Sequence, residues 1–356
     1  PPPLRSWQDL VSLCRYALTR LGRYMQIIWV GSGQCFSFLA RLLGIFARPA
    51  VFFSGVLLAF SALAEPYAAR TQVQGYIDEL VETHGFSRMA LEEVFAQASK
   101  QERIIELMSR PAERRLVWHE YRKILVDEPR VSHGIIFWRE NEAALERAAK
   151  IYGVAPEIIV AIIGVETRYG RIMGNFGVVD ALSTLAFDYP PRAEFFRGQL
   201  TQHFLLSREE GKNPLSMQGS YAGAMGFGQF IPSSYRAYAV DFDGDGVRDI
   251  WANKTDAIGS VANYFAEHGW RGAEGVVERV TLGDETSELR ALINSGLKPT
   301  VTVAEWRTMG VQVGPEQDDS RLATLMRMEQ ESGNEYWLGY DDFYVITRYN
   351  HSRLYA

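Results

Sequence analysis

One stretch of the chain decides the fold, and it reads Ile158-Ile159-Val160-Ala161-Ile162-Ile163-Gly164-Val165-Glu166-Thr167-Arg168-Tyr169-Gly170. Apolar residues recur in it at helical spacing, Pro156 stands just before it and a glycine ends it, a pattern typical of a helix. Glu166 follows Ile162 by four residues and Ile163 by three, so the three side chains share a helical face. Poor solvation there raises the pKa of a carboxyl group, which suits a general acid near neutral pH. We predict a helix from Pro156 to about Tyr169 that presents Glu166 as a catalytic acid. Two alternatives for this residue are a structural ion pair with one of the nearby arginines and a helix end that reaches solvent.

A glycine-rich block lies further along the chain and reads Gly219-Ser220-Tyr221-Ala222-Gly223-Ala224-Met225-Gly226-Phe227-Gly228-Gln229-Phe230-Ile231-Pro232. Its glycines allow the backbone to approach a ligand closely, while Ser220, Gln229 and the aromatic rings offer hydrogen bonds and flat faces for sugars. A helix is expected to start at Pro232. The alternative is a tight turn that only serves packing.

The remaining patterns indicate a mainly helical α+β protein. Helical spacing is found at Tyr76, Ile77, Leu80 and Val81, and again at Leu91, Val94 and Phe95 after a candidate N-cap, Ser87. Further helices are expected from Pro111, with Leu116, Val117 and Tyr121 on one side, and from Glu142 through Ala149. After Gly269, short alternating runs at 276–280 and 300–303 predict strands around a small helix at 288–295.

Composition bounds the class of protein. The 356 residues are 47% hydrophobic with a formal net charge of -6, which is ordinary for a globular chain. The apolar run 49–64 follows Arg48 and ends in Ala-Leu-Ala, as an export signal does, so we expect a mature chain from about Glu65. Residues 1–64 carry six arginines and one aspartate, so their removal changes the charge to -11. That acidity disfavours nucleic acid as a partner. Both cysteines, Cys14 and Cys35, would be removed too, and a lipid anchor is weakly supported.

The apolar helix and the glycine-rich block, in this order, resemble the lytic transglycosylase B family of bacterial cell walls. The resemblance runs from about Ile77 to Tyr355 and includes the motifs 256–265 and 346–350. It implies a lysozyme-like catalytic core with a helical lobe and a small β-containing subdomain. The expected parts are an export segment 1–64, a helical lobe 65–150, a catalytic core 151–270, a β-containing subdomain 271–335 and a C-terminal return to the core groove, 336–356.

The same resemblance implies the chemistry. Glu166 matches the single catalytic acid of the family, which cleaves the MurNAc-GlcNAc β-1,4 bond of peptidoglycan and forms 1,6-anhydro-MurNAc during cell-wall remodelling and turnover. Because an internal hydroxyl replaces water, no second carboxylate is required. Sugar contacts are implied for Tyr121, Arg192, Ser220, Gln229, Tyr264, Tyr349, Asn350 and Tyr355. Pro191 departs from the family, whose members often have a second arginine there, so contacts to a carboxylate would depend on Arg192.

An acidic run, 241–249, matches the first nine positions of an EF-hand loop, with acids at positions 1, 3, 5 and 9 and glycine at position 6. Position 12 is Ala252 rather than glutamate. The family closes its longer loop with an aspartate that Asp256 matches, although this chain has an extra residue before it. We expect structural Ca²⁺ bound by Asp241, Asp243, Asp245, Val247 and Asp256, and no organic cofactor. The alternative is an acidic turn without calcium.

Two other functions fit the sequence less well. A lysozyme-type hydrolase would need a positioned base for water, and a calcium-dependent wall-binding protein would need no catalytic acid. The expected partners are peptidoglycan glycan strands and cell-wall synthesis complexes, with a monomeric chain in the periplasm.

Overall fold

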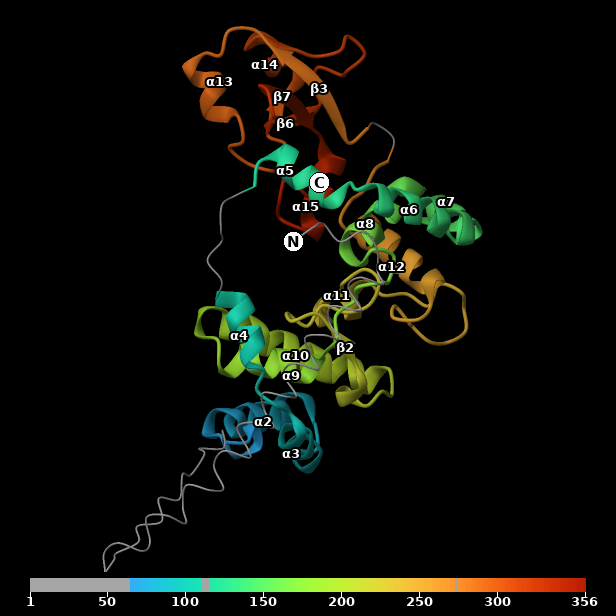
Figure 1. Cartoon of the computed structure of the whole chain (residues 1–356), viewed down its shortest axis with the longest axis vertical. Coiled ribbons are helices and arrows are strands. Elements are labelled where there is room, and N and C mark those ends of the chain that lie inside the picture. Colours follow the sequence, from blue (N-terminus) through green and yellow to red (C-terminus); the bar gives the residue numbers. More distant parts are fainter. Residues whose placement is uncertain (1–64, 110–115, 273–274) are drawn as a thin grey trace, which may run out of the picture. The chain divides into compact units, whose positions relative to one another are not determined.

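The structure is a computed structural model that describes residues 65–109, 116–272 and 275–356 (Figure 1). The described residues belong to one compact unit. The predicted export segment, the two cysteines and the helix start at Pro111 lie outside them.

The helices are η1 (Tyr67–Ala69), α2 (Thr71–His84), α3 (Arg88–Gln97), α4 (Glu102–Ser109), α5 (Trp118–Leu125), α6 (Glu128–Glu140), α7 (Glu142–Tyr152), α8 (Pro156–Thr167), α9 (Val178–Phe187), η2 (Pro190–Arg192), α10 (Ala193–Glu209), η3 (Pro214–Ser216), α11 (Pro232–Tyr238), α12 (Lys254–Glu267), α13 (Ser287–Leu292), α14 (Val303–Thr308) and α15 (Asp341–Tyr349). The strands are β1 (Phe176–Gly177), β2 (Gln218–Gly219), β3 (Val277–Leu282), β4 (Val301–Thr302), β5 (Val311–Gln312), β6 (Leu322–Glu329) and β7 (Asn334–Gly339). The predicted α+β class, mainly helical, is confirmed.

Several predicted helices form for the reasons that the sequence suggested. The Ser87 hydroxyl caps α3 by accepting a hydrogen bond from the backbone NH of Ala90 at 3.4 Å. Pro156 stands at the first turn of α8 and Pro232 at the first turn of α11, where a missing NH costs nothing.

Two predicted helix boundaries, at the start of α5 and the end of α8, are wrong. Leu116 and Val117 precede α5, which begins only at Trp118, because Val117 is extended and its NH is bonded to the carboxylate of Glu120. α8 ends at Thr167, two residues early, because Arg168 and Tyr169 both adopt the left-handed conformation.

In the predicted strand at 300–303, only Val301 and Thr302 are extended. Thr302 caps α14 and pairs with Glu305 in a capping box, so Val303 is already helical.

Five of the strands form an antiparallel sheet in the order β4-β6-β7-β3-β5, with α13 and α14 beside it (Figure 1), and β1 pairs with β2 in a separate two-stranded sheet. β6 and β7 are a hairpin in which Leu325 pairs with Leu338, and β3 pairs with the other edge of β7. β7 crosses the predicted border at residue 335, so the sheet continues to Gly339.

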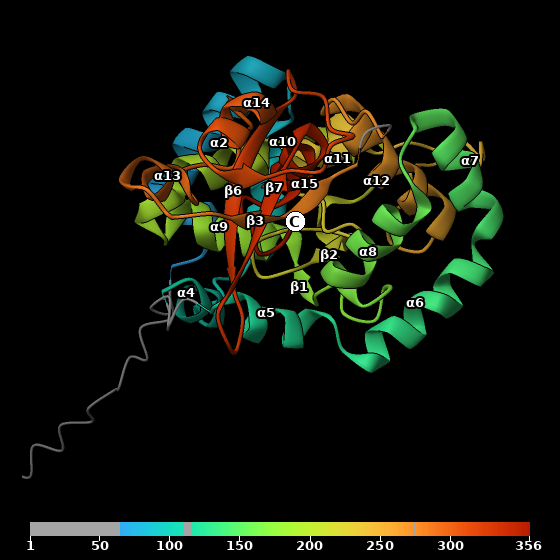
Figure 2. The ribbon, with the colours of Figure 1, turned by 90° about the horizontal axis from the view of Figure 1, so that it is seen from above.

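Two large apolar clusters form the core of the helical part. The first joins α2 and α3 to α9, α10 and the glycine-rich block, and the second joins α6, α7 and α8 to α12 and α15. Figure 2 shows α6, α7, α8 and α12 grouped together. Tyr349 packs against both clusters, so it lies where they meet.

Among the described residues, no single helix has the length and apolarity to cross a membrane. α7 and α8 meet the criterion only as a pair, and they are bent by 115° at their junction.

Two helical glycines provide a test of the packing. A Cβ at Gly259 in α12 would lie 2.3 Å from the ring of Phe242, whereas one at Gly75 in α2 would meet nothing within 4 Å. We expect Gly259→Ala to lower the free energy of unfolding by about 1–3 kcal/mol through overpacking. Gly75→Ala should raise it by about 0.5–1 kcal/mol through helix propensity. Urea denaturation measures both, and a stabilised Gly259→Ala variant would contradict the packing of Phe242.

Candidate functional site

Glu166 lies in the last turn of α8, and most of its surface is covered by neighbouring residues. Burial raises the pKa of its carboxyl group, and a hydrogen bond from the Tyr355 hydroxyl to its Oε1 atom partly offsets this rise by favouring the charged form. The carboxyl group is thus held by one donor in a poorly solvated place. Such a group can give up a proton and take it back near neutral pH.

Two more tyrosines lie near this carboxyl group, and a third packs against one of them. Burial raises the pKa of Tyr121 and of Tyr349, and the nearby charge of Glu166 raises both further. The Tyr349 hydroxyl donates to the carbonyl of Gly228, and its ring lies 4.7 Å from that of Tyr264. The Tyr264 hydroxyl donates in turn to the carbonyl of Arg348 at 2.7 Å. Tyr121 and Tyr349, predicted as sugar contacts, therefore lie near the charge of Glu166, and Tyr264 packs against Tyr349 behind them.

The glycine-rich wall, which we define as residues 219–230, faces the end of α8. Gln229 adopts a left-handed φ of 50° and donates from Nε2 to the carbonyls of Gly226 at 3.0 Å and Met173 at 3.2 Å. The hydroxyl of Ser220 accepts from the backbone NH groups of Ala222 and Ala224. Gln229 therefore ties the wall to the loop after α8, while Ser220 shapes a turn within the wall.

Arg192, Asn350 and Ser220, also predicted as sugar contacts, form no hydrogen bond with Glu166 in the described part of the chain. Arg192 is exposed, and its guanidinium lies 4.4 Å from the ring centre of Phe195. Asn350 is exposed at the end of α15, and Ser220 bonds within its own turn.

One residue of this site, Thr167, was missed by sequence reasoning. Thr167 is fully buried, and its hydroxyl lies 3.0 Å from the carbonyl oxygen of Phe227 in the wall. The signal was available, because a threonine on an otherwise apolar helix needs a buried partner. Which partner it has depends on the tertiary fold.

The acidic loop, residues 241–256, brings three of its predicted ligands together. One carboxylate oxygen from each of Asp241, Asp243 and Asp256 lies within 4.8 Å of the others. Asp256 is fully buried and accepts from the backbone NH groups of Phe242 at 2.7 Å and Asp249 at 2.8 Å. The predicted closing ligand therefore reaches the loop despite the extra residue.

The other two predicted ligands, Asp245 and Val247, are not part of this group. Asp245 is exposed, and its carboxylate accepts from the backbone NH of Val247 at 2.8 Å. Hard cations such as Ca²⁺ prefer a set of carboxylate and carbonyl oxygens, and the loop offers them.

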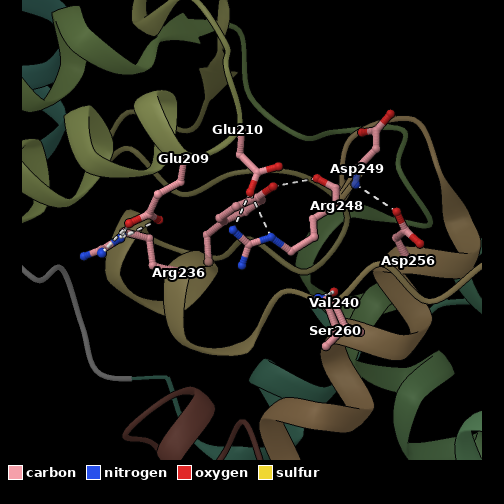
Figure 3. A network of polar contacts seen from close by, with 9 residues as sticks. Glu209, Glu210, Arg236, Val240, Arg248, Asp249, Asp256 and Ser260 are labelled. Carbon is pink, nitrogen blue, oxygen red and sulfur yellow. Dashed lines mark hydrogen bonds and ion pairs between the residues drawn. The ribbon is translucent and has the colours of Figure 1, made fainter. Parts of the chain in front are cut away.

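Ion pairs and hydrogen bonds brace the acidic loop, as Figure 3 shows. The guanidinium of Arg248 pairs with the carboxylate of Glu210, directly after α10. The backbone carbonyl of Arg248 accepts a hydrogen bond from the hydroxyl of Tyr235. The hydroxyl of Ser260 in α12 accepts from the backbone NH of Val240 at 3.0 Å. The loop is therefore anchored on both sides by elements of the helical core.

These features define a class of protein. A buried carboxyl group among tyrosines, opposite a glycine-rich wall, is an enzyme site suited to proton transfer at a sugar oxygen. Residues 68–356 match the family model described as the transglycosylase SLT domain. The chain belongs to this family, and the predicted family and enzyme class are confirmed.

Individual relatives agree with the family. Membrane-bound lytic murein transglycosylase B of Escherichia coli strain K12 is 43% identical over 299 residues, which are 82% of this chain and 81% of the relative. The solved structure of soluble lytic transglycosylase SltB1 from Pseudomonas aeruginosa is 49% identical, with a TM-score of 0.77 over 80% of this chain and 94% of that one. Escherichia coli Slt35, solved in complex with calcium, is 44% identical, with a TM-score of 0.72 over 82% and 89%. The predicted lysozyme-like fold is confirmed.

The raised pKa of Glu166 predicts a cost in stability. Because the pKa is higher in the folded than in the unfolded chain, burying the charge costs free energy above the folded pKa, and the cost vanishes below the unfolded pKa of about 4. Glu166→Gln, which keeps an oxygen acceptor for Tyr355, should therefore be more stable than wild type at pH 7 by about 1 kcal/mol. The gain should disappear near pH 3.5. Thermal unfolding across pH measures it.

The control for this prediction is Glu157→Gln at the exposed first turn of the same helix. It removes one negative charge without relieving burial, so its stability should not rise at pH 7. If Glu166→Gln were no more stable than Glu157→Gln at neutral pH, Glu166 would not be the poorly solvated acid that the site requires.

Proposed function

We propose that this transglycosylase cleaves the β-1,4 bond between MurNAc and GlcNAc in peptidoglycan and leaves 1,6-anhydro-MurNAc ends. The observation that carries the proposal is the Glu166 carboxyl group, buried among tyrosines, with a raised pKa and a single side-chain donor. Family membership supports it, and so does the name of the Escherichia coli relative, which describes a lytic murein transglycosylase. The role is cell-wall remodelling and turnover.

In the first step, protonated Glu166 gives its proton to the glycosidic oxygen, and the bond from that oxygen to C1 of MurNAc breaks. GlcNAc leaves with the proton on its O4 atom. Positive charge develops on the muramyl ring, and the Glu166 carboxylate is now negative. Both charges are close together in a poorly solvated place, where their attraction is stronger than in water.

In the second step, the C6 hydroxyl of the same MurNAc attacks C1 and returns its proton to Glu166. The new C1 to O6 bond closes the 1,6-anhydro ring, and the carboxyl group is restored. Acid and base are one residue, so no second carboxylate is needed to activate water. The Tyr355 hydroxyl stabilises the charged intermediate state of Glu166.

We propose contacts to the sugars for the predicted residues. Tyr121, Tyr264, Tyr349 and Tyr355 supply rings and hydroxyl groups beside the acid, and Gln229 supplies its amide from the glycine-rich wall. Arg192, Ser220 and Asn350 contact other parts of the strand or its peptide stem; Arg192 and Asn350 are exposed and so are accessible to it.

We propose the division of the chain that the sequence predicts. Residues 1–64 direct export to the periplasm and are removed, 65–150 form the helical lobe, 151–270 the catalytic core and 336–356 the return to its groove. The β-containing subdomain, predicted at 271–335, extends to Gly339 at the end of β7, so the return to the groove begins at Tyr340 instead of 336. The Escherichia coli relative is named membrane-bound, so anchoring by the N-terminal segment is the alternative to cleavage. We expect a monomer that acts on glycan strands and joins cell-wall synthesis complexes.

We propose that the acidic loop binds structural Ca²⁺ through the predicted ligands. The convergence of the carboxylates of Asp241, Asp243 and Asp256 supports this proposal, as does the calcium complex of Slt35. Asp245 and the carbonyl of Val247 complete the set at the exposed side of the loop. The cation would offset repulsion between acids and would leave the proton transfer at Glu166 untouched.

Product analysis tests the function. Wild type acting on purified peptidoglycan should release muropeptides with 1,6-anhydro ends, each lighter by one water than a hydrolysis product. Glu166→Gln should slow release by about 10²- to 10⁴-fold, since it removes the general acid and base. Mass spectrometry and reducing-end assays report both results.

Three outcomes would contradict this function. Reducing MurNAc ends from wild type would indicate a hydrolase. Wild type that binds the wall and releases nothing would indicate a binding protein. Full activity of Glu166→Gln would remove the acid from the mechanism.

Calcium binding is tested by thermal unfolding. At a hundredfold excess over its Kd, Ca²⁺ should stabilise the wild type by about 2.7 kcal/mol, because it binds only the folded loop. Asp243→Asn, at an exposed loop position, should weaken this response, whereas Asp284→Asn, an exposed acid outside the loop, should keep it. An equal response of all three proteins would place the cation elsewhere.

A further inference from the structure

The end of the catalytic helix is an unusual turn. Arg168 and Tyr169, directly after Thr167, have left-handed φ values of 50° and 61°, although neither is glycine. Side chains rarely adopt this conformation because it costs free energy, so a structure that contains two in succession must stabilise them by other contacts. Gln229 in the glycine-rich wall is a third such residue. Three of the four non-glycine residues with positive φ in the described ranges therefore lie at the end of α8 or in the glycine-rich wall.

The hydroxyl of Thr167 lies between the two strained segments. Its oxygen accepts from the backbone NH of Gly170 at 3.0 Å, which closes the turn after the helix. It has one proton to donate, and two carbonyl oxygens are within reach, Ile163 at 3.1 Å and Phe227 at 3.0 Å. The bond to Ile163 is the ordinary one for a helical threonine, whereas the bond to Phe227 joins α8 to the wall.

The surroundings of Phe227 leave little freedom for this junction. Its ring packs on Gly170, where a Cβ would lie 2.2 Å from the ring. Its backbone NH donates at 2.9 Å to the carbonyl of Ile250 in the acidic loop. The backbone NH of Phe227 therefore holds the wall to the acidic loop. On its other side, the carbonyl of Phe227 lies in hydrogen-bond reach of the Thr167 hydroxyl, which joins the wall to α8.

We propose that Thr167 is a positioning residue for the reaction. Its hydroxyl holds the turn after Glu166 against the glycine-rich wall, so that the carboxyl group and Gln229 face the same substrate at a fixed separation. Thr167 itself is fully buried and touches no substrate. The inference depends on the proposed function, because it assigns a partner to the acid of that reaction.

The test replaces the hydroxyl and keeps the shape. Thr167→Val removes the donor and acceptor, and Thr167→Ser keeps both. If small displacements of the acid limit the reaction, Thr167→Val should lower kcat on solubilised peptidoglycan strands by about 10- to 100-fold. KM should change by less than roughly threefold, because ground-state binding is retained. Thr167→Ser should keep most of the wild-type kcat.

A matched control separates positioning from loss of stability. Thr184 in α9 is also fully buried, and its hydroxyl accepts from the backbone NH of Gln101 at 3.0 Å, away from the residues around Glu166. Thr184→Val should lose stability and keep its kcat when assayed below its unfolding temperature. If Thr167→Val does not fold, Thr167→Ala removes the same hydroxyl with less steric demand and is evaluated in the same way.

The inference is overturned if the hydroxyl-free variant at position 167 keeps its kcat within roughly threefold of wild type or loses no more than Thr184→Val. It is also overturned if Thr167→Ser loses as much as Thr167→Val, since the methyl group would then be what matters. Failure of the proposed function is distinct, because wild type itself would then form no anhydro ends.

Discussion

Burial of one carboxyl group among apolar helices constrains the rest of this structure. Glu166 lies in the last turn of α8, where water covers little of its surface, so its charged form is unfavourable and its pKa rises. The helix is fixed by apolar packing on its other faces, in the cluster that includes Ile159, Ile162 and Ile163. Tyr349 packs against both large clusters, and the nearby charge of Glu166 raises the pKa of its hydroxyl. The acid therefore lies near the junction of the two apolar clusters, so its environment depends on the packing of the whole helical part.

The same location explains why strained backbone gathers around it. The wall lies so close to the end of α8 and to its own neighbours that side chains at positions 170, 226 and 228 would collide with Phe227, Ile250 and Tyr349. Glycine at each position removes the obstacle. The left-handed residues Arg168, Tyr169 and Gln229 then cost free energy, and Thr167 and the Gln229 amide provide compensating hydrogen bonds.

The sequence predicted the elements whose signals are local. The cap at Ser87, the proline starts of α8 and α11 and the apolar face of α8 depend on neighbouring residues, and each was confirmed. The end of α8 was predicted two residues late, because Arg168 and Tyr169 carry no local signal for a left-handed turn that tertiary contacts impose. The bond from Tyr355 to Glu166 spans 189 positions, so only family resemblance suggested that these residues belong to one site. Thr167 escaped notice because its partner, Phe227, is likewise distant in the sequence.

The acidic loop holds the glycine-rich wall that faces Glu166. Three carboxylates within 4.8 Å of one another repel, so a conformation that collects them needs compensation from the protein itself. Backbone NH groups of Phe242, Asp243 and Asp249 point at the two oxygens of buried Asp256 and supply part of it. Arg248 is held by Glu210, which fixes the far end of the loop. The carbonyl of Ile250, directly after these anchored residues, then accepts from Phe227 in the glycine-rich wall. Because the chain alone fixes this path from acidic loop to wall to Thr167, a bound cation would strengthen a geometry that the hydrogen bonds have already set.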